Sequence, residues 1–173
     1  MRMANGLSKI LRYILAVSIF AVAFAFTETT TVVYLRKLFG FDVGYLPPRP
    51  KILLNLGFIA FLSPETLVLP DRFITQVELL REASTIIILI TVALLSAKKL
   101  KESLGTFLIA FSIWDIFYYI FLRSLTGWPT SLWDVDVFFL IPLPWVGPVL
   151  TPIVISGALF LFGIYLWLEK KHL

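Results

Sequence analysis

The chain has 173 residues, of which 59% are hydrophobic and 15% charged, whereas soluble domains average about 45–50% and about 25%. It contains no cysteine and one histidine, His172, and its formal net charge is +4. This composition excludes disulfides, iron–sulfur clusters, His- or Cys-ligated zinc, His-ligated haem and an intramembrane Ser-His or Cys-His pair. It favours a membrane protein whose apolar residues form long runs.

The first long apolar run covers residues 13–35 and follows a basic start. Its length fits one helix crossing a ~30 Å hydrocarbon core at ~1.5 Å per residue. A cleaved signal peptide is the rival interpretation, because small residues occur at Ala21, Ala23 and Ala25. The run stays apolar beyond that point, which a cleavage site does not require.

Residues 36–73 form the first predicted loop, which prolines at 47, 48 and 50 keep from being one continuous helix. Within it, Ile52 to Leu62 is an apolar piece of 11 residues, too short to span a membrane. We expect an interfacial or half-inserted helix lying over the bundle, with a surface helix of a folded loop as the alternative.

Three further spans are predicted at residues 74–97, 104–125 and 148–168. Residues 126–147 form the second predicted outer loop. Its segment 130–147 is rich in proline and tryptophan, so we expect it to be irregular and to lie at headgroup level. The predicted fold class is therefore an all-α membrane protein, a single bundle of four transmembrane helices.

Four spans place both chain ends on one side of the membrane. That side carries eight basic residues against two acidic ones, Glu102 and Glu169. The positive-inside rule therefore predicts cytoplasmic termini and a multi-pass protein of the cell inner (cytoplasmic) membrane. Basic residues beside lipid headgroups also make nucleic acid a poor candidate partner.

Three predicted spans carry an acidic residue at a similar depth. Glu28, Glu82 and Asp115 each lie eight or nine residues from the outer end of their span, roughly 12–14 Å below the boundary. Intramembrane charges are costly and generally face the bundle interior or a water-filled cavity. We therefore expect these carboxylates to meet in one polar layer, accompanied by further polar residues of spans two and three: Glu78, Arg81, Thr85, Tyr119 and Arg123.

Three functions are compatible with this layer. The first is an outward-facing site for a cation or proton, with Glu28, Glu82 and Asp115 as candidate metal ligands, because carboxylates suit hard divalent cations. The second is an enzyme acting on a lipid or quinone-like substrate, in which Glu82 or Asp115 is the general acid or base and Arg81 or Arg123 holds an anionic group. The third is a structural subunit whose buried ion pairs fix helix packing.

The remaining acidic pair is ambiguous. Asp134 and Asp136 either cover the layer as a lid or are solvated loop residues. The aromatic residues of the third span are expected to face lipid or the core rather than a cofactor. Besides the lipid bilayer, we expect homo-oligomerisation or other membrane subunits, because four helices are few for a transporter.

Three strings carry a resemblance, namely residues 81–85 (REAST), 114–119 (WDIFYY) and 127–131 (GWPTS), together with the segment 142–148. They resemble a group of small prokaryotic polytopic membrane proteins to which no activity is assigned. The resemblance implies a prokaryotic inner-membrane protein and implies nothing about chemistry.

Overall fold

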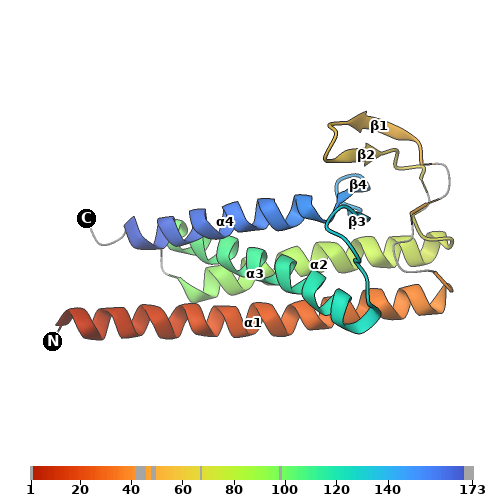
Figure 1. Ribbon diagram of the computed structural model, residues 1–173. Coiled ribbons are helices and arrows are strands. Elements are labelled where there is room, and N and C mark those ends of the chain that lie inside the picture. Colours follow the sequence, from red (N-terminus) through yellow and green to blue (C-terminus); the bar gives the residue numbers. More distant parts are fainter. Residues whose placement is uncertain (1, 42–45, 48–49, 67, 98, 170–173) are drawn as a thin grey trace.

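The computed structural model describes residues 2–41, 46–47, 50–66, 68–97 and 99–169. Four long helices lie side by side, and a small sheet covers one end of them (Figure 1). The helices are α1 (Arg2–Leu38), α2 (Arg72–Ser96), α3 (Leu100–Thr126) and α4 (Leu150–Leu168). Each contains a segment long and apolar enough to cross a membrane. The described chain ends lie together at the end of the bundle opposite the sheet (Figure 1).

Local sequence explains where the helices begin and end. The Asp71 carboxylate caps α2 by accepting a hydrogen bond from the Ile74 amide at 2.9 Å. Gly127 ends α3 in the left-handed conformation at φ 77°, where its amide bonds the Arg123 carbonyl. Gly40, at φ 64°, follows the last turn of α1 in the same way.

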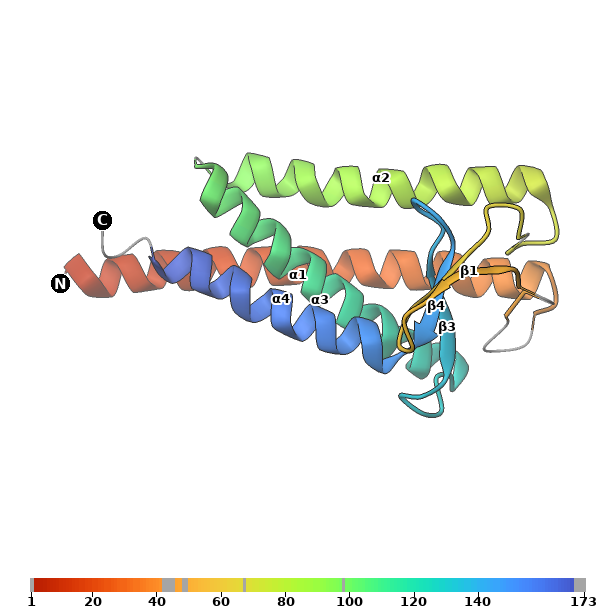
Figure 2. The same ribbon diagram turned by 90° about the horizontal axis from the view of Figure 1, so that it is seen from above.

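Helix α3 is central and contacts the other three helices. Small residues permit the close approach: Ala21 and Ala25 of α1 are fully buried, and Gly105 of α3 faces Gly163 of α4. Helices α2 and α3 diverge from the turn that joins them, and the gap widens toward the sheet (Figure 2).

The sheet corrects the all-α prediction. It contains β1 (Ile52–Asn55), β2 (Ala60–Leu62), β3 (Val135–Phe139) and β4 (Trp145–Pro148), in the order β1-β2-β4-β3 with all neighbours antiparallel. It draws its two hairpins from the two predicted loops, which meet where β2 pairs with β4.

The expected interfacial helix at residues 52–62 is therefore wrong, because this segment is the β1–β2 hairpin. Asn55 accepts a hydrogen bond from the Gly57 amide at 2.8 Å, and Gly57 has φ 86°, a conformation that favours glycine. Residues 130–147 are likewise more regular than expected. Pro142 and Pro144 lie between β3 and β4, so they remove no donor from either strand.

Candidate functional site

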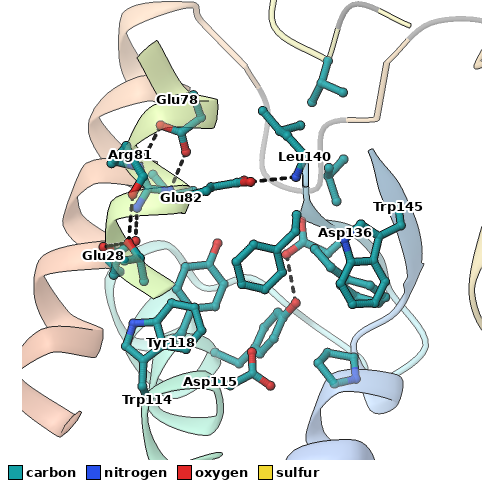
Figure 3. Close-up of a pocket in the computed structure, with 18 of the residues that line it drawn as sticks. Glu28, Glu78, Arg81, Glu82, Trp114, Asp115, Tyr118, Asp136, Leu140 and Trp145 are labelled. Atoms are coloured by element: carbon teal, nitrogen blue, oxygen red, sulfur yellow. Dashed lines mark hydrogen bonds and ion pairs between the residues drawn. The ribbon is translucent and has the colours of Figure 1, made fainter. Parts of the chain in front are cut away.

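A cavity of about 170 Å³ opens at the sheet end of the bundle, partly exposed to the surroundings (Figure 3). All four helices contribute to its wall, and β3, β4 and the residues between them close it on one side. Most of the wall is apolar and aromatic, but it also carries seven ionisable acidic and basic side chains: Glu28, Arg36, Glu78, Arg81, Glu82, Asp115 and Asp136. This cavity, which we call the acidic pocket, is the candidate site.

Arg81 is held by two carboxylates on one side of the acidic pocket. Its guanidinium donates to Glu78, one turn earlier on α2, at 2.8 and 2.6 Å, and it forms an ion pair with Glu28 of α1. The second oxygen of Glu28 accepts a hydrogen bond from the Thr85 hydroxyl at 2.7 Å. These contacts connect α1 to α2 and occupy the arginine fully, so Arg81 offers little to an anionic ligand.

Glu82 reaches across the acidic pocket from α2 toward the β3–β4 hairpin (Figure 3). Its carboxylate accepts a hydrogen bond from the Leu140 amide at 2.8 Å, and the residue is only 7% exposed. In the part of the chain that the structure describes, Glu82 forms no ion pair with a basic side chain. It is therefore a buried carboxyl group with a neutral hydrogen-bond donor and no salt bridge within the described chain, although the charge of the adjacent Arg81 acts on it.

Asp115 of α3 is also a buried carboxyl group without a salt bridge in the described chain. It is 8% exposed and accepts a hydrogen bond from the Ser156 hydroxyl of α4 at 2.7 Å. Among the residues described, no lysine or arginine pairs with it. The acidic pocket thus holds two buried carboxyl groups, Glu82 and Asp115, without a salt-bridge partner.

Asp136 of β3 lies on the opposite wall from Glu28 and is 2% exposed. Its two oxygens accept hydrogen bonds at 3.2 Å from the Arg36 guanidinium and from the Tyr119 hydroxyl. Burial raises the pKa of Asp136 to about 6, against the lowering effects of Arg36, the Val137 amide and Tyr119. Desolvation therefore outweighs the ion pair at this position.

This raised pKa predicts a pH dependence of stability. The folded protein binds a proton at Asp136 more tightly than the unfolded chain, so this residue's contribution to the free energy of unfolding falls as pH rises from about 4 to about 6. The loss is about 3 kcal/mol for a shift of this size. Melting temperatures of the wild type and of Asp136→Asn across this range check it. The difference between the two proteins should change with pH, and a constant difference would contradict the assignment.

The charges in the acidic pocket do not balance. Five carboxyl groups line it against two guanidinium groups, an excess of three acidic groups. Arg81 is shared by Glu28 and Glu78, and Arg36 pairs with Asp136. Among the described residues Glu82 and Asp115 have no ion pair, and the third excess negative charge belongs to the Glu28–Glu78 pair that shares one arginine. A buried carboxylate without a counter-charge is costly, so such groups bind a proton or a cation.

Three N–H groups on the wall also lack hydrogen-bond partners among the described residues: Arg36 Nη1, Trp114 Nε1 and Trp145 Nε1. Trp114 is 5% exposed, and Trp145 lies at the edge of the hollow beside Asp136 (Figure 3). Buried donors are normally satisfied by protein, water or a ligand. The wall therefore offers donors as well as carboxylates.

Most predicted polar-layer residues come together in the acidic pocket, including Thr85 and Tyr119. Arg123 does not line it, because its guanidinium binds the carbonyls of Gly127 and Pro129 beyond the end of α3. Asp134 also lies outside it and accepts hydrogen bonds from the Thr130 amide and hydroxyl, at 2.7 and 2.9 Å, and from the Ser131 amide, at 3.2 Å. These bonds hold the pKa of Asp134 below its usual value.

The structure does not gather the three candidate metal ligands into one cluster. Within the described ranges, no group of three or more acidic or histidine residues could hold a metal ion. Glu28 pairs with Arg81, Glu82 binds the Leu140 amide, and Asp115 binds Ser156, so each carboxylate is drawn toward a different element. Glu28, Glu82 and Asp115 thus line one pocket, as their similar positions along the helices predict, but their oxygen atoms do not point toward a common centre.

Sequence reasoning missed several parts of the site. Ser156 is a hydroxyl in the middle of the apolar helix α4, and its small polar side chain was the available signal. Trp145 and the Leu140 amide reach the acidic pocket only because the segment 126–147 folds back as a hairpin. The Leu140 amide carries no side-chain signal at all.

The chain was compared with known proteins by sequence and by structure. No protein-family model, no curated protein and no solved structure matches it. The resemblance drawn from the three sequence strings thus stays an expectation, and no relative assigns a function to the acidic pocket.

Proposed function

We propose that this protein is a multi-pass membrane protein that binds a proton or a monovalent cation at Glu82 and Asp115 in the acidic pocket. The observation that carries the proposal is the excess of acidic groups in one partly open cavity, with these two carboxyl groups left outside the ion pairs. A proton or cation from outside the chain supplies the missing positive charge and can leave again, because the cavity is open.

The structural alternative explains only part of the site. Ion pairs that fix helix packing account for Glu28 and Glu78 with Arg81, and for Asp136 with Arg36. They do not account for Glu82 and Asp115, since a purely structural site would hold neutral residues there at lower cost. The enzyme alternative rests on the same pocket and has no separate observation in its favour.

The test is a binding titration of the purified protein in lipid nanodiscs. Tryptophan fluorescence is followed as protons, Na⁺ or K⁺ are added, because Trp114 and Trp145 lie in the wall of the acidic pocket. We expect a saturable change in the wild type that the double variant Glu82→Gln/Asp115→Asn abolishes. Glu65→Gln, an exposed acid outside the pocket, is the matched control and should respond as the wild type does.

A response that survives in the double variant, or the absence of any saturable response in the wild type, would contradict the proposal. The melting temperature of each variant, measured in the same nanodiscs, separates a lost site from a lost fold.

The orientation follows from the charge distribution. We propose that both termini lie in the cytoplasm and that the acidic pocket opens outward, because eight basic residues flank the terminal ends of the spans. The lipid bilayer is the proposed partner of the exposed apolar helix faces, and a second copy or another membrane subunit covers part of them. We propose the inner membrane of a prokaryote as the location.

The chain has no cysteine, so single cysteines report this topology directly. A membrane-impermeant maleimide added to whole cells, with the outer membrane permeabilised where one is present, should label Ser131→Cys, which lies at the sheet end, and spare Lys99→Cys at the opposite end. The reverse pattern would place the acidic pocket on the cytoplasmic side.

A further inference from the structure

We infer that the ligand of the acidic pocket is a small organic monocation, a quaternary ammonium or protonated amine, rather than a metal ion. This inference rests on the proposed function and names the chemical class of the cation. It is carried by what surrounds the two unpaired carboxyl groups: aromatic faces, few oxygen ligands and more room than a bare ion fills.

Aromatic rings form a continuous part of the wall. Phe139 stacks on Trp145 and also contacts Trp114, with ring centroids 6.0 Å apart in both pairs, and Phe138 meets Trp145 edge-on at 5.6 Å. Tyr118 adds a further ring beside Glu82 (Figure 3). Ring faces attract alkylammonium groups by cation–π interaction, and aromatic surfaces combined with carboxylates recognise quaternary ammonium ligands in proteins.

The oxygen ligands that a metal ion requires are lacking. A hard divalent cation takes six or more oxygen atoms at short distance, whereas the three acids considered as ligands bind three different partners. A cavity of about 170 Å³ has room for several water molecules and exceeds the size of one dehydrated ion. The acidic excess disfavours an anionic ligand.

The indole N–H groups without hydrogen-bond partners among the described residues indicate a further feature of the ligand. Trp145 Nε1 has no partner among the described residues and lies across the hollow from Glu82 (Figure 3). A neutral oxygen on the ligand, such as a hydroxyl or an ether, satisfies this donor without adding negative charge. The expected ligand is therefore an ammonium group that carries a short arm with an oxygen acceptor.

The position of the acidic pocket suggests how such a ligand reaches it. A second, apolar hollow of about 290 Å³ lies between α2 and α3 nearer their turn, lined among others by Ile90, Leu94 and Phe107. The acidic pocket lies at the sheet end of the bundle and is lined by residues of all four helices. We expect a free alkylammonium ion to enter the acidic pocket from the sheet end of the bundle, where the cavity is partly open.

The experiment uses the full chain in nanodiscs of phosphatidylglycerol, a lipid without an amine, and measures binding by isothermal titration calorimetry. Choline is compared with 3,3-dimethylbutan-1-ol, which has the same shape but no charge, and with Na⁺ and K⁺. We expect choline to bind at least tenfold more tightly than the neutral alcohol. Trp145→Leu should weaken choline binding by about twofold to thirtyfold, and Glu82→Gln/Asp115→Asn should abolish it.

The outcomes separate the two proposals. If the alcohol binds as tightly as choline, or if choline does not bind while Na⁺ or protons still give a response that requires Glu82 and Asp115, the organic-cation inference is overturned and the proposed function stands. If no cation response requires these carboxyl groups, the proposed function fails as well. Weaker apparent binding of free choline in phosphatidylcholine nanodiscs would identify a lipid headgroup as the source of the ammonium and support the inference.

Discussion

Arg81→Met is expected to destabilise the protein by about 3–5 kcal/mol, the cost of leaving a buried ion pair without one partner. The Arg81 side chain is only 24% exposed, and it forms ion pairs with the carboxylates of Glu28 and Glu78, which are 9% and 12% exposed. Removing the guanidinium leaves two adjacent carboxylates facing apolar surroundings and removes the ion pair that joins α1 to α2. Thermal unfolding in nanodiscs measures the change.

The control is the exposed pair of Lys51 and Glu65, with side chains 69% and 81% exposed. Lys51→Met should change stability by less than about 0.5 kcal/mol, because solvent screens the pair. The triple variant Arg81→Met/Glu28→Gln/Glu78→Gln should recover part of the loss, since it removes the uncompensated charges. Equal melting temperatures for Arg81→Met and Lys51→Met would show that Arg81 is not buried among carboxylates.

The double variant Glu82→Gln/Asp115→Asn is expected to stabilise the protein, whereas Arg81→Met destabilises it. At alkaline pH both carboxyl groups are ionised in a mostly apolar pocket, and replacing them by amides removes a penalty of several kcal/mol per buried charge, less the cost of imperfect hydrogen bonding. The variant should therefore unfold at a higher temperature than the wild type at pH 9 while it loses cation binding. A gain in stability with a loss of function is typical of a binding site.

Saturating cation provides the internal control. Because a ligand that binds only the folded state raises its stability, choline should raise the melting temperature of the wild type and leave the double variant unchanged. If the double variant is less stable than the wild type at pH 9, the two carboxylates are structural partners and the account of the acidic pocket is wrong.

The helices follow from the sequence because each is a long apolar run, and the membrane interior requires such runs to satisfy their backbone groups internally. Among the described residues the structure has four such helices, at bounds close to the predicted spans. The polar layer could also be predicted from the sequence, since Glu28, Glu82 and Asp115 are rare charged residues at a matching depth in three apolar runs. All three line the acidic pocket.

The sheet could not be predicted from the sequence in the same way. The apolar run 52–62 has no alternation that distinguishes a strand from a helix, and only Asn55 and Gly57 indicate a turn. Strand β4 pairs with β2 across more than 80 residues of sequence, a contact that local patterns do not encode. The Leu140 amide and Trp145 depend on that pairing, so the sheet-side wall of the acidic pocket could be seen only in the structure.

The most direct test of the central claim is an infrared difference spectrum of the protein in nanodiscs at neutral pH, recorded before and after saturating cation. The account predicts protonated carboxyl groups in the empty pocket, whose C=O band disappears on cation binding, and it predicts no such change in Glu82→Gln/Asp115→Asn. An identical band change in the double variant, or cation binding without any carboxyl change, would contradict it.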